Sequence, residues 1–146
     1  MEMMVYFAMQ GTTGLGVTEE CKSSFMELKK KKVHKYIVFK IDEGSREVRV
    51  EKVGASDASY HDFATSLPHD DCRYAVFDFD FLTLDNCHKS RIFFIQWCPT
   101  ASRIRAKILY ATSKGGLRRE LDGVHYDLQA TDPTEMGIQV IRDTAK

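Results

Sequence analysis

The feature that most constrains this fold is a pair of neighbouring apolar stretches, 73–81 (RYAVFDFDF) and 91–98 (RIFFIQWC). Aromatic and aliphatic residues dominate both stretches, and the polar segment 83–90 (TLDNCHKS) lies between them. This pattern predicts two strands that are joined by a turn. The order in which strands and helices alternate along the chain then determines which faces of the sheet the helices cover.

Three more strands and five helices follow from the patterning. The strands are expected over 36–41, 47–53 and 124–130, and the helices over 18–32, 59–68, 101–114, 117–122 and from 132 almost to 146. Thr18 is a helix cap, Ser59 with Asp62 resembles a capping box, and Gly115 and Gly116 are expected to break the long helix. Hairpins combined with crossovers predict an α+β fold, a central five-stranded mixed sheet flanked by helices on both faces.

Composition limits the classes of function. The chain has 146 residues, 43% of them hydrophobic, which is typical of one domain. Its 21 basic and 21 acidic residues balance, so nonspecific nucleic-acid binding, which needs a basic excess, is not expected. No stretch approaches the roughly 20 apolar residues of a spanning helix. The four cysteines show no CxxC spacing, which predicts reduced thiols and no zinc site.

One carboxylate pair is a candidate catalytic centre. Asp78 and Asp80 stand two apart on a predicted strand and therefore share a face. Such a pair could act as acid and base or hold a metal for a hydrolase. The alternative is a polar strand rim, paired with nearby cations or backbone N–H groups. No HExxH, G-x-S-x-G or glycine-rich phosphate motif accompanies the pair, so we predict no enzyme and no cofactor.

The predicted helix within 101–121 (ASRIRAKILYATSKGGLRREL) carries an unusual number of cations. A helical wheel assigns a core stripe to Ala101, Ile104, Ile108 and Ala111. It assigns an outward face to Ser102, Ala106, Leu109 and Ser113, with Arg103, Lys107 and Lys114 along one edge and Arg105 on the other. Two interpretations remain open from spacing alone: a solvated helix face, or a helix that lies in a groove of an acidic partner.

The lysine run Lys29, Lys30, Lys31 and Lys32 also has several interpretations. A solvated helix end is the commonest, because cations are favoured at helix C-termini. The run could also act as a nuclear import signal or contact acidic lipid headgroups. A basic adaptor directed to phosphoinositides or to the nucleus is therefore an alternative function.

Several long motifs resemble one family. The stretch RAKILYATSK is similar to the signature helix of the ADF/cofilin actin-depolymerising proteins, and DDCRYAVFDFDF, KSRIFFIQWCP, RRELDGVHYDLQATDPTEM and KVHKYIVFKI resemble the plant branch of that family. The resemblance implies an ADF-homology domain over 14–146, preceded by a flexible extension over 1–13. It also implies a monomer without catalytic activity that binds actin monomers and filament sides and promotes severing and depolymerisation.

The resemblance assigns residues to two actin surfaces. Those implied in binding both monomers and filaments are Leu15, Gly16, Val17, Arg105, Lys107, Ile108, Leu109 and Lys114. Those implied in filament binding alone are Lys89, Arg91 and Arg142; many plant relatives carry a further basic residue where this chain has Thr144. Phosphoinositides are expected to compete for Arg105 and Lys107, since both ligands are acidic.

The N-terminal extension raises two further expectations. Thr13 stands where the family carries a regulatory phosphorylated serine, and a phosphate there would oppose an acidic partner. The long, apolar extension also resembles a plant subgroup in which some members bundle filaments, so bundling is the alternative to severing. The expected location is the cytoplasmic actin cytoskeleton, with the nucleus as a second site if the lysine run is an import signal.

Overall fold

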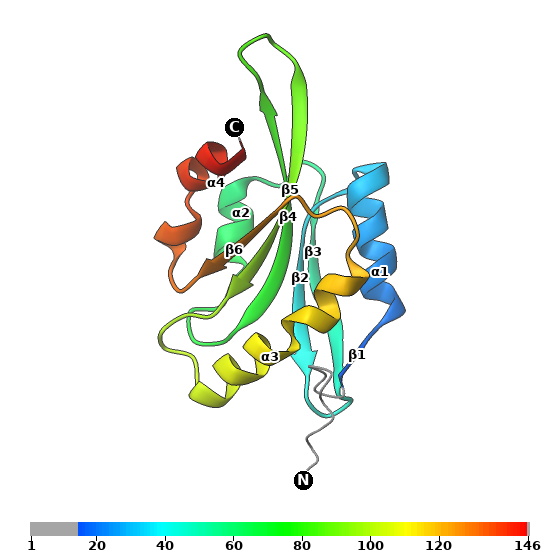
Figure 1. Ribbon diagram of the computed structural model, residues 1–146, viewed down its shortest axis with the longest axis vertical. Helices are drawn as coiled ribbons and strands as arrows, with labels where there is room; N and C mark the ends of the chain where they lie inside the picture. The colour runs from blue at the N-terminus through cyan, green and yellow to red at the C-terminus, as the bar shows by residue number, and fades with distance from the viewer. Residues whose placement is uncertain (1–14, 146) are drawn as a thin grey trace.

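The computed structural model describes residues 15–145. Its elements are β1 (Gly16–Val17), α1 (Glu19–Met26), the π-helical turn η2 (Glu27–Lys31), β2 (His34–Asp42), β3 (Glu47–Ala55), α2 (Tyr60–Thr65), β4 (Arg73–Leu82), β5 (His88–Trp97), α3 (Ile104–Glu120), β6 (Tyr126–Ala130), the 3-10 turn η3 (Pro133–Met136) and α4 (Ile138–Ala145). Figure 1 shows the sheet with helices on both faces, which confirms the predicted α+β architecture.

The sheet has the strand order β1-β3-β2-β4-β5-β6. The four central strands are antiparallel, whereas β1 and β6 pair in parallel with β3 and β5 at the two edges. All five predicted strands are present. The sixth, β1, was missed because two residues are too few to show any periodicity. It pairs only with Glu47 and Val48 at the start of β3.

Two hydrophobic clusters lie on opposite faces of the sheet. Figure 1 shows α1 and α3 over one face and α2 and α4 over the other. Phe25 and Leu117 belong to the first cluster, and Phe63 and Ile141 belong to the second. The second cluster contains a stacked aromatic pair, Phe63 and Phe77, with ring centroids 5.1 Å apart. Burial on both faces explains why the central strands are so uniformly apolar.

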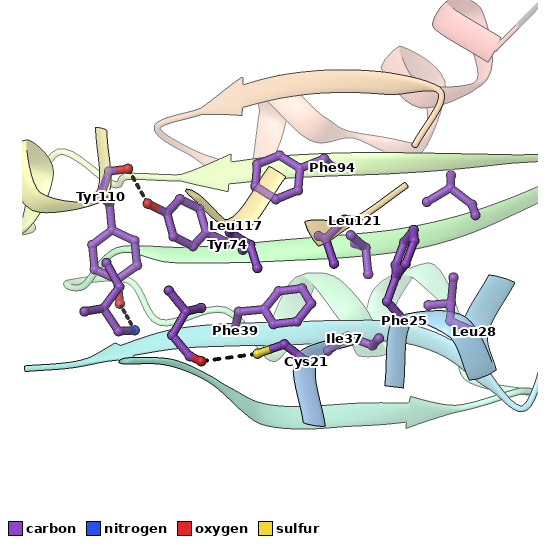
Figure 2. Packing of buried hydrophobic residues seen from close by; sticks show 14 of the residues in the cluster. Cys21, Phe25, Leu28, Ile37, Phe39, Tyr74, Phe94, Tyr110, Leu117 and Leu121 are labelled. Atoms are coloured by element: carbon purple, nitrogen blue, oxygen red, sulfur yellow. Dashed lines mark hydrogen bonds between the residues drawn. The ribbon is translucent and has the colours of Figure 1, made fainter. Parts of the chain in front are cut away.

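Tyrosine hydroxyls fix α3 on the sheet (Figure 2). The Tyr74 hydroxyl donates to the backbone carbonyl of Tyr110, and the Tyr110 hydroxyl accepts from the backbone N–H of Ile41 at 2.9 Å. Leu117 and Leu121 complete the buried side of the helix. Both tyrosines are buried, so each needs such a partner for its hydroxyl. This anchoring determines which side of α3 meets solvent.

The orientation predicted for α3 was wrong. The presumed core residues Ile104 and Ile108 are 73% and 60% exposed, whereas Ser102 and Ser113, which were placed outward, are buried. At 100° per residue, Tyr110 and Leu117 lie on the side roughly opposite Ile104. The helical wheel treated the isoleucines as the buried side of the helix. In the structure Tyr110 is buried instead, because it is larger and makes two hydrogen bonds, one through its hydroxyl and one through its backbone carbonyl.

Two helix boundaries also differ from prediction. Gly115 and Gly116 do not interrupt α3, which continues to Glu120. The predicted last helix is divided, because Gly137 adopts an extended conformation between η3 and α4. The capping box of Ser59 and Asp62 at the start of α2 is confirmed. Thr18 stands at the α1 cap, but its hydroxyl contacts the Cys21 thiol at 3.3 Å instead of a helix N–H.

The glycines within α3 predict a gain in stability on substitution. A Cβ built at Gly115 comes no closer than 3.7 Å to its nearest neighbour, the Arg119 guanidinium. We expect Gly115→Ala to raise the free energy of unfolding by about 0.5–1 kcal/mol, because alanine has the higher helix propensity. Urea denaturation of the variant measures this change, and an unaltered midpoint would contradict it.

Gly54 on β3 predicts the opposite outcome. It faces Tyr36 across the strand pair, and a Cβ there would lie 2.1 Å from the Tyr36 ring. That ring packs against Phe63 at 5.3 Å and cannot move without opening the cluster. We expect Gly54→Ala to lower the free energy of unfolding by about 3 kcal/mol. Urea denaturation tests this too, and the additional variant Tyr36→Ala in the Gly54→Ala background should remove the clash.

Candidate functional site

A groove of about 560 Å³ runs along the N-terminal half of α3. The residues around it are Leu15, Glu43, Arg46, Ile104, Arg105, Ile108, Leu109 and Thr112. They come from the segment before β1, from the β2–β3 turn and from α3. The structure therefore brings together Leu15, Arg105, Ile108 and Leu109, which are distant in sequence but were assigned to one surface.

The groove combines large apolar side chains with charged ones. Ile104 and Ile108 lie one turn apart on α3 and both project from the surface. Large apolar side chains exposed side by side and rimmed by charges are typical of contact surfaces. Ile108 therefore faces outward and not into the core, where the helical wheel had assigned it. Ile104 was not among the predicted site residues; its spacing of four from Ile108 could have identified it.

The cations in the first turn of α3 are placed against the electrostatic preference of the helix. Arg105 pairs with Glu43 at 2.8 Å, and the Lys107 ammonium donates to the backbone carbonyl of Thr100 at 3.0 Å. The first turn of α3 contains no acidic residue and its cap, Arg103, makes no side-chain hydrogen bond to the helix. The positive end of a helix dipole favours acids by about 0.3–1 kcal/mol each. Helix stability therefore does not explain the cations.

The other residues assigned to this surface lie beside the groove. Gly16 and Val17 form β1, and the Gly16 N–H donates to the Arg46 carbonyl at 2.9 Å. This pairing holds Leu15 next to α3. Lys114 is farther along α3, where its ammonium lies 5.8 Å from the centre of the Phe94 ring. The structure does not bring Lys114 into the groove.

A second pocket, of about 820 Å³, lies where the β4–β5 hairpin meets α4. Lys89, Arg91 and Arg142 all line it, so the structure gathers the three cations that the resemblance assigned to filament binding. Leu82 and Leu84 are exposed on the same hairpin and also line the pocket. Leu84, an apolar residue within a polar turn, was not among the predicted site residues, although its position could have identified this surface.

The groove and the pocket occupy opposite ends of the molecule. In Figure 1 the hairpin projects from the upper end of the sheet and α4 lies beside it, whereas α3 begins near the lower end, where β1 lies. Each surface combines exposed apolar side chains with cations. Thr144 on α4 does not line the pocket; its hydroxyl donates to the Val140 carbonyl at 2.8 Å.

The lysine run is divided between structural and exposed positions. The Lys29 ammonium donates to the Asp122 carbonyl at 2.8 Å, and Lys32 contacts Asp78 and the Ser90 hydroxyl, both at 2.7 Å. Lys30 and Lys31 are exposed. Half of the run is therefore engaged within the fold: Lys29 contacts the loop after α3, and Lys32 contacts the sheet.

The carboxylate pair also has cationic partners. Asp78 pairs with Lys32, and Asp80 pairs with Lys35 at 2.9 Å. Over residues 15–145 no three or more His, Cys, Asp or Glu side chains gather as a metal site would require. Nearby, burial lowers the pKa of His125, with Arg91 contributing, and its Nδ1 accepts from the Ile92 N–H at 2.8 Å. A neutral imidazole is required for that bond.

Two expectations fall beyond these surfaces. Thr13 and the rest of the 1–13 extension lie outside the described residues. Among the residues that the structure describes, no helix has both the length and the apolar character to cross a membrane.

Comparison with known proteins identifies the family. The family model for cofilin/tropomyosin-type actin-binding proteins matches residues 14–146. Actin-depolymerizing factors 5 and 9 of Arabidopsis thaliana are 71% and 67% identical over 135 residues, covering 92% of this chain and 94% and 96% of theirs. The crystal structure of Streptomyces griseoflavus cofilin gives a TM-score of 0.84 at 32% identity, covering 91% of this chain and 98% of that one. The chain belongs to the cofilin/tropomyosin-type family of actin-binding proteins.

Proposed function

We propose that this protein binds actin monomers and filament sides and promotes filament severing and depolymerisation. The observation that carries the proposal is the groove beside α3, where exposed isoleucines lie between basic side chains. The related proteins that are named as actin-depolymerizing factors match nearly the full chain. No step of the proposed activity requires catalysis or a cofactor, since binding energy alone can shift a filament between conformations.

The α3 groove is the proposed contact with both monomers and filaments. Ile104 and Ile108 supply apolar area that a partner would bury, and Arg105 and Lys107 supply charge complementary to an acidic surface. A protein with zero net charge gains no attraction from its overall field, so this local clustering would direct the encounter. Acidic phosphoinositide headgroups suit the same cations and would compete with actin for them.

The hairpin pocket is the proposed filament-specific contact. Lys89, Arg91 and Arg142 would meet a second actin subunit while α3 contacts the first. One monomeric protein that contacts two adjacent subunits changes their relative orientation if it binds the altered arrangement more tightly than the original one. That preference for an altered filament is the proposed cause of severing. The separation of the two surfaces also suits the alternative outcome, in which one molecule bridges two filaments and bundles them.

Two measurements on the wild-type protein test this function. Co-sedimentation with actin filaments reports binding, and imaging of single labelled filaments reports the outcome. We expect the protein to pellet with filaments and the filaments to break and shorten. Thick, persistent cables would instead identify bundling, and a protein that stays in the supernatant at saturating actin would contradict the proposal. Staining of plant cells for the protein would separately report cytoplasmic or nuclear location.

A further inference from the structure

Two cysteines face each other at the ends of β4 and β5. In this antiparallel pair Arg73 is opposite Trp97, so the next positions outward are Cys72 and Cys98. Both are free thiols, and both pack in the hydrophobic cluster beneath α3. The Cys98 N–H donates to the Ala130 carbonyl of β6 at 2.9 Å, which holds its backbone in place. The fold itself therefore sets the two side chains against each other.

The geometry of such a pair suits a disulfide. Residues directly opposite in antiparallel strands have Cβ atoms about 4.5–5.5 Å apart on one face of the sheet. A disulfide requires a Cβ separation of about 3.5–4.5 Å, which a small adjustment at two strand ends provides. The side chains already interact: burial raises the pKa of the Cys98 thiol, and the adjacent Cys72 thiol raises it further.

The two thiols differ in access. Cys72 is completely buried, and its thiol donates to the Ser102 hydroxyl at 3.4 Å, whereas Cys98 is partly exposed. An oxidant in solution would therefore reach Cys98 first. The other two cysteines lack such a neighbour: Cys21 is buried on α1, where its thiol donates to the Val48 carbonyl, and Cys87 is exposed on the β4–β5 hairpin.

We propose that Cys72 and Cys98 form a reversible intramolecular disulfide when a low-molecular-weight disulfide such as glutathione disulfide accumulates. The Cys98 thiolate attacks one sulfur of the oxidant, and one glutathione leaves as its thiolate. The Cys72 thiolate then attacks the Cys98 sulfur of this mixed disulfide and releases the second glutathione. The two cysteine protons end on the two glutathione thiols, so two cysteines are oxidised and one glutathione disulfide is reduced.

The disulfide would form beside the segment that leads into α3, the helix that we propose contacts actin. Residue 98 leads directly into the segment that precedes α3, and the Ser102 hydroxyl on that segment donates to the Pro99 carbonyl. Oxidation replaces the Cys72 thiol contact with Ser102 by a covalent link between the two strand ends. It thereby constrains the unfolded chain, so the oxidised protein should melt several degrees higher than the reduced protein. This inference does not depend on the proposed actin binding.

The test uses the full chain with Cys87→Ser, which removes the exposed thiol. The protein is incubated with glutathione disulfide in mildly alkaline buffer, because burial raises the pKa of the Cys98 thiol and so lowers its thiolate fraction. Intact mass spectrometry should show the loss of two hydrogen atoms, and proteolytic mapping should link the peptides of Cys72 and Cys98. Dithiothreitol should reverse both signals. The matched control, Cys87→Ser with Cys98→Ala, should acquire no internal link.

Three outcomes would overturn the inference. The first is glutathione that remains on Cys98 without transfer to Cys72. The second is a link that includes Cys21. The third is a Cys72–Cys98 link that forms only after denaturant is added, because that link would arise in the unfolded chain. If the linked protein melts at a lower Tm than the reduced protein, the predicted stabilisation by the disulfide is wrong, although the disulfide itself is established.

Discussion

Replacing both Arg105 and Lys107 with glutamate is expected to weaken actin binding by about 100-fold or more, which corresponds to about 2.7 kcal/mol. Both side chains lie at the exposed start of α3, beside the groove that we assign to actin. Reversal removes two attractions to an acidic partner and adds two repulsions. Co-sedimentation with actin filaments, repeated at low and high salt, measures the loss and its electrostatic origin.

The same double variant should keep its fold and a stability at least equal to that of the wild type. The Arg105–Glu43 pair is solvent-exposed at 83% and 53%, and such pairs contribute about 0–1 kcal/mol. Glutamates in the first turn of α3 would interact favourably with the positive end of the helix dipole. A Tm equal to or above that of wild type is therefore expected. A large fall in Tm would mean that these cations support the fold.

A matched control is available in the lysine run. Lys30→Glu with Lys31→Glu makes the same change in net charge at two exposed positions on another helix. This variant should bind actin as the wild type does, because the run is not part of either surface. Equal losses from the two double variants would show that overall charge, and not the α3 groove, controls binding. Loss from the lysine variant alone would place the actin contact at the lysine run and not at the α3 groove.

Lys32→Met is expected to lower the free energy of unfolding by about 2–4 kcal/mol, because it leaves a buried carboxylate without its cation. The Asp78 side chain is 3% exposed and lies 2.7 Å from the Lys32 ammonium. Its other oxygen, Oδ1, has no hydrogen-bond partner within residues 15–145. The estimate lies below that for a fully buried pair because the Lys32 side chain is about half exposed. Urea denaturation with a two-state fit measures the change.

Two further variants isolate the cause. Lys31→Met, at the neighbouring exposed position, should change the stability by less than about 0.5 kcal/mol. Adding Asp78→Asn to Lys32→Met should recover part of the loss, since a neutral amide needs no counter-charge. If Lys32→Met lowers the free energy of unfolding as little as Lys31→Met does, the Lys32–Asp78 pair does not stabilise the fold. If Asp78→Asn gives no recovery, the lost packing of the lysine stem is the cause.

The strands and their connections were predictable because they depend on local patterns. The apolar runs around Phe77 and Phe93 and the Ser59–Asp62 box specify structure without distant partners. The family resemblance also supplied residues for both surfaces; their roles in actin binding remain predictions. Residue patterning alone, without the resemblance, could not bring Arg91 and Arg142 to one pocket, since strand and helix ends meet only through the tertiary fold.

The orientation of α3 was missed for a different reason. Periodicity locates an apolar stripe but does not say which of two stripes is buried. In α3 the stripe containing Ile104 and Ile108 competes with the stripe containing Tyr110 and Leu117. Only when the stripe with Tyr110 and Leu117 is buried does the Tyr110 hydroxyl accept from the Ile41 N–H, and the Tyr110 carbonyl from the Tyr74 hydroxyl. The choice thus depends on polar partners in the sheet, which a single-helix projection does not include.

Within the described part of the chain, the short pairing of β1 with β3 leaves most of one side of β3 without a neighbouring strand. The pairing of β1 with β3 ends at Val48. The rest of β3 carries the exposed charged residues Arg49, Glu51 and Lys52. Charged side chains along a sheet edge discourage strand addition by another molecule. A protein that crowds side by side along a polymer experiences high local concentrations of its own copies. Under the proposed filament-side binding, we expect this charged edge to discourage neighbouring copies from pairing strand to strand.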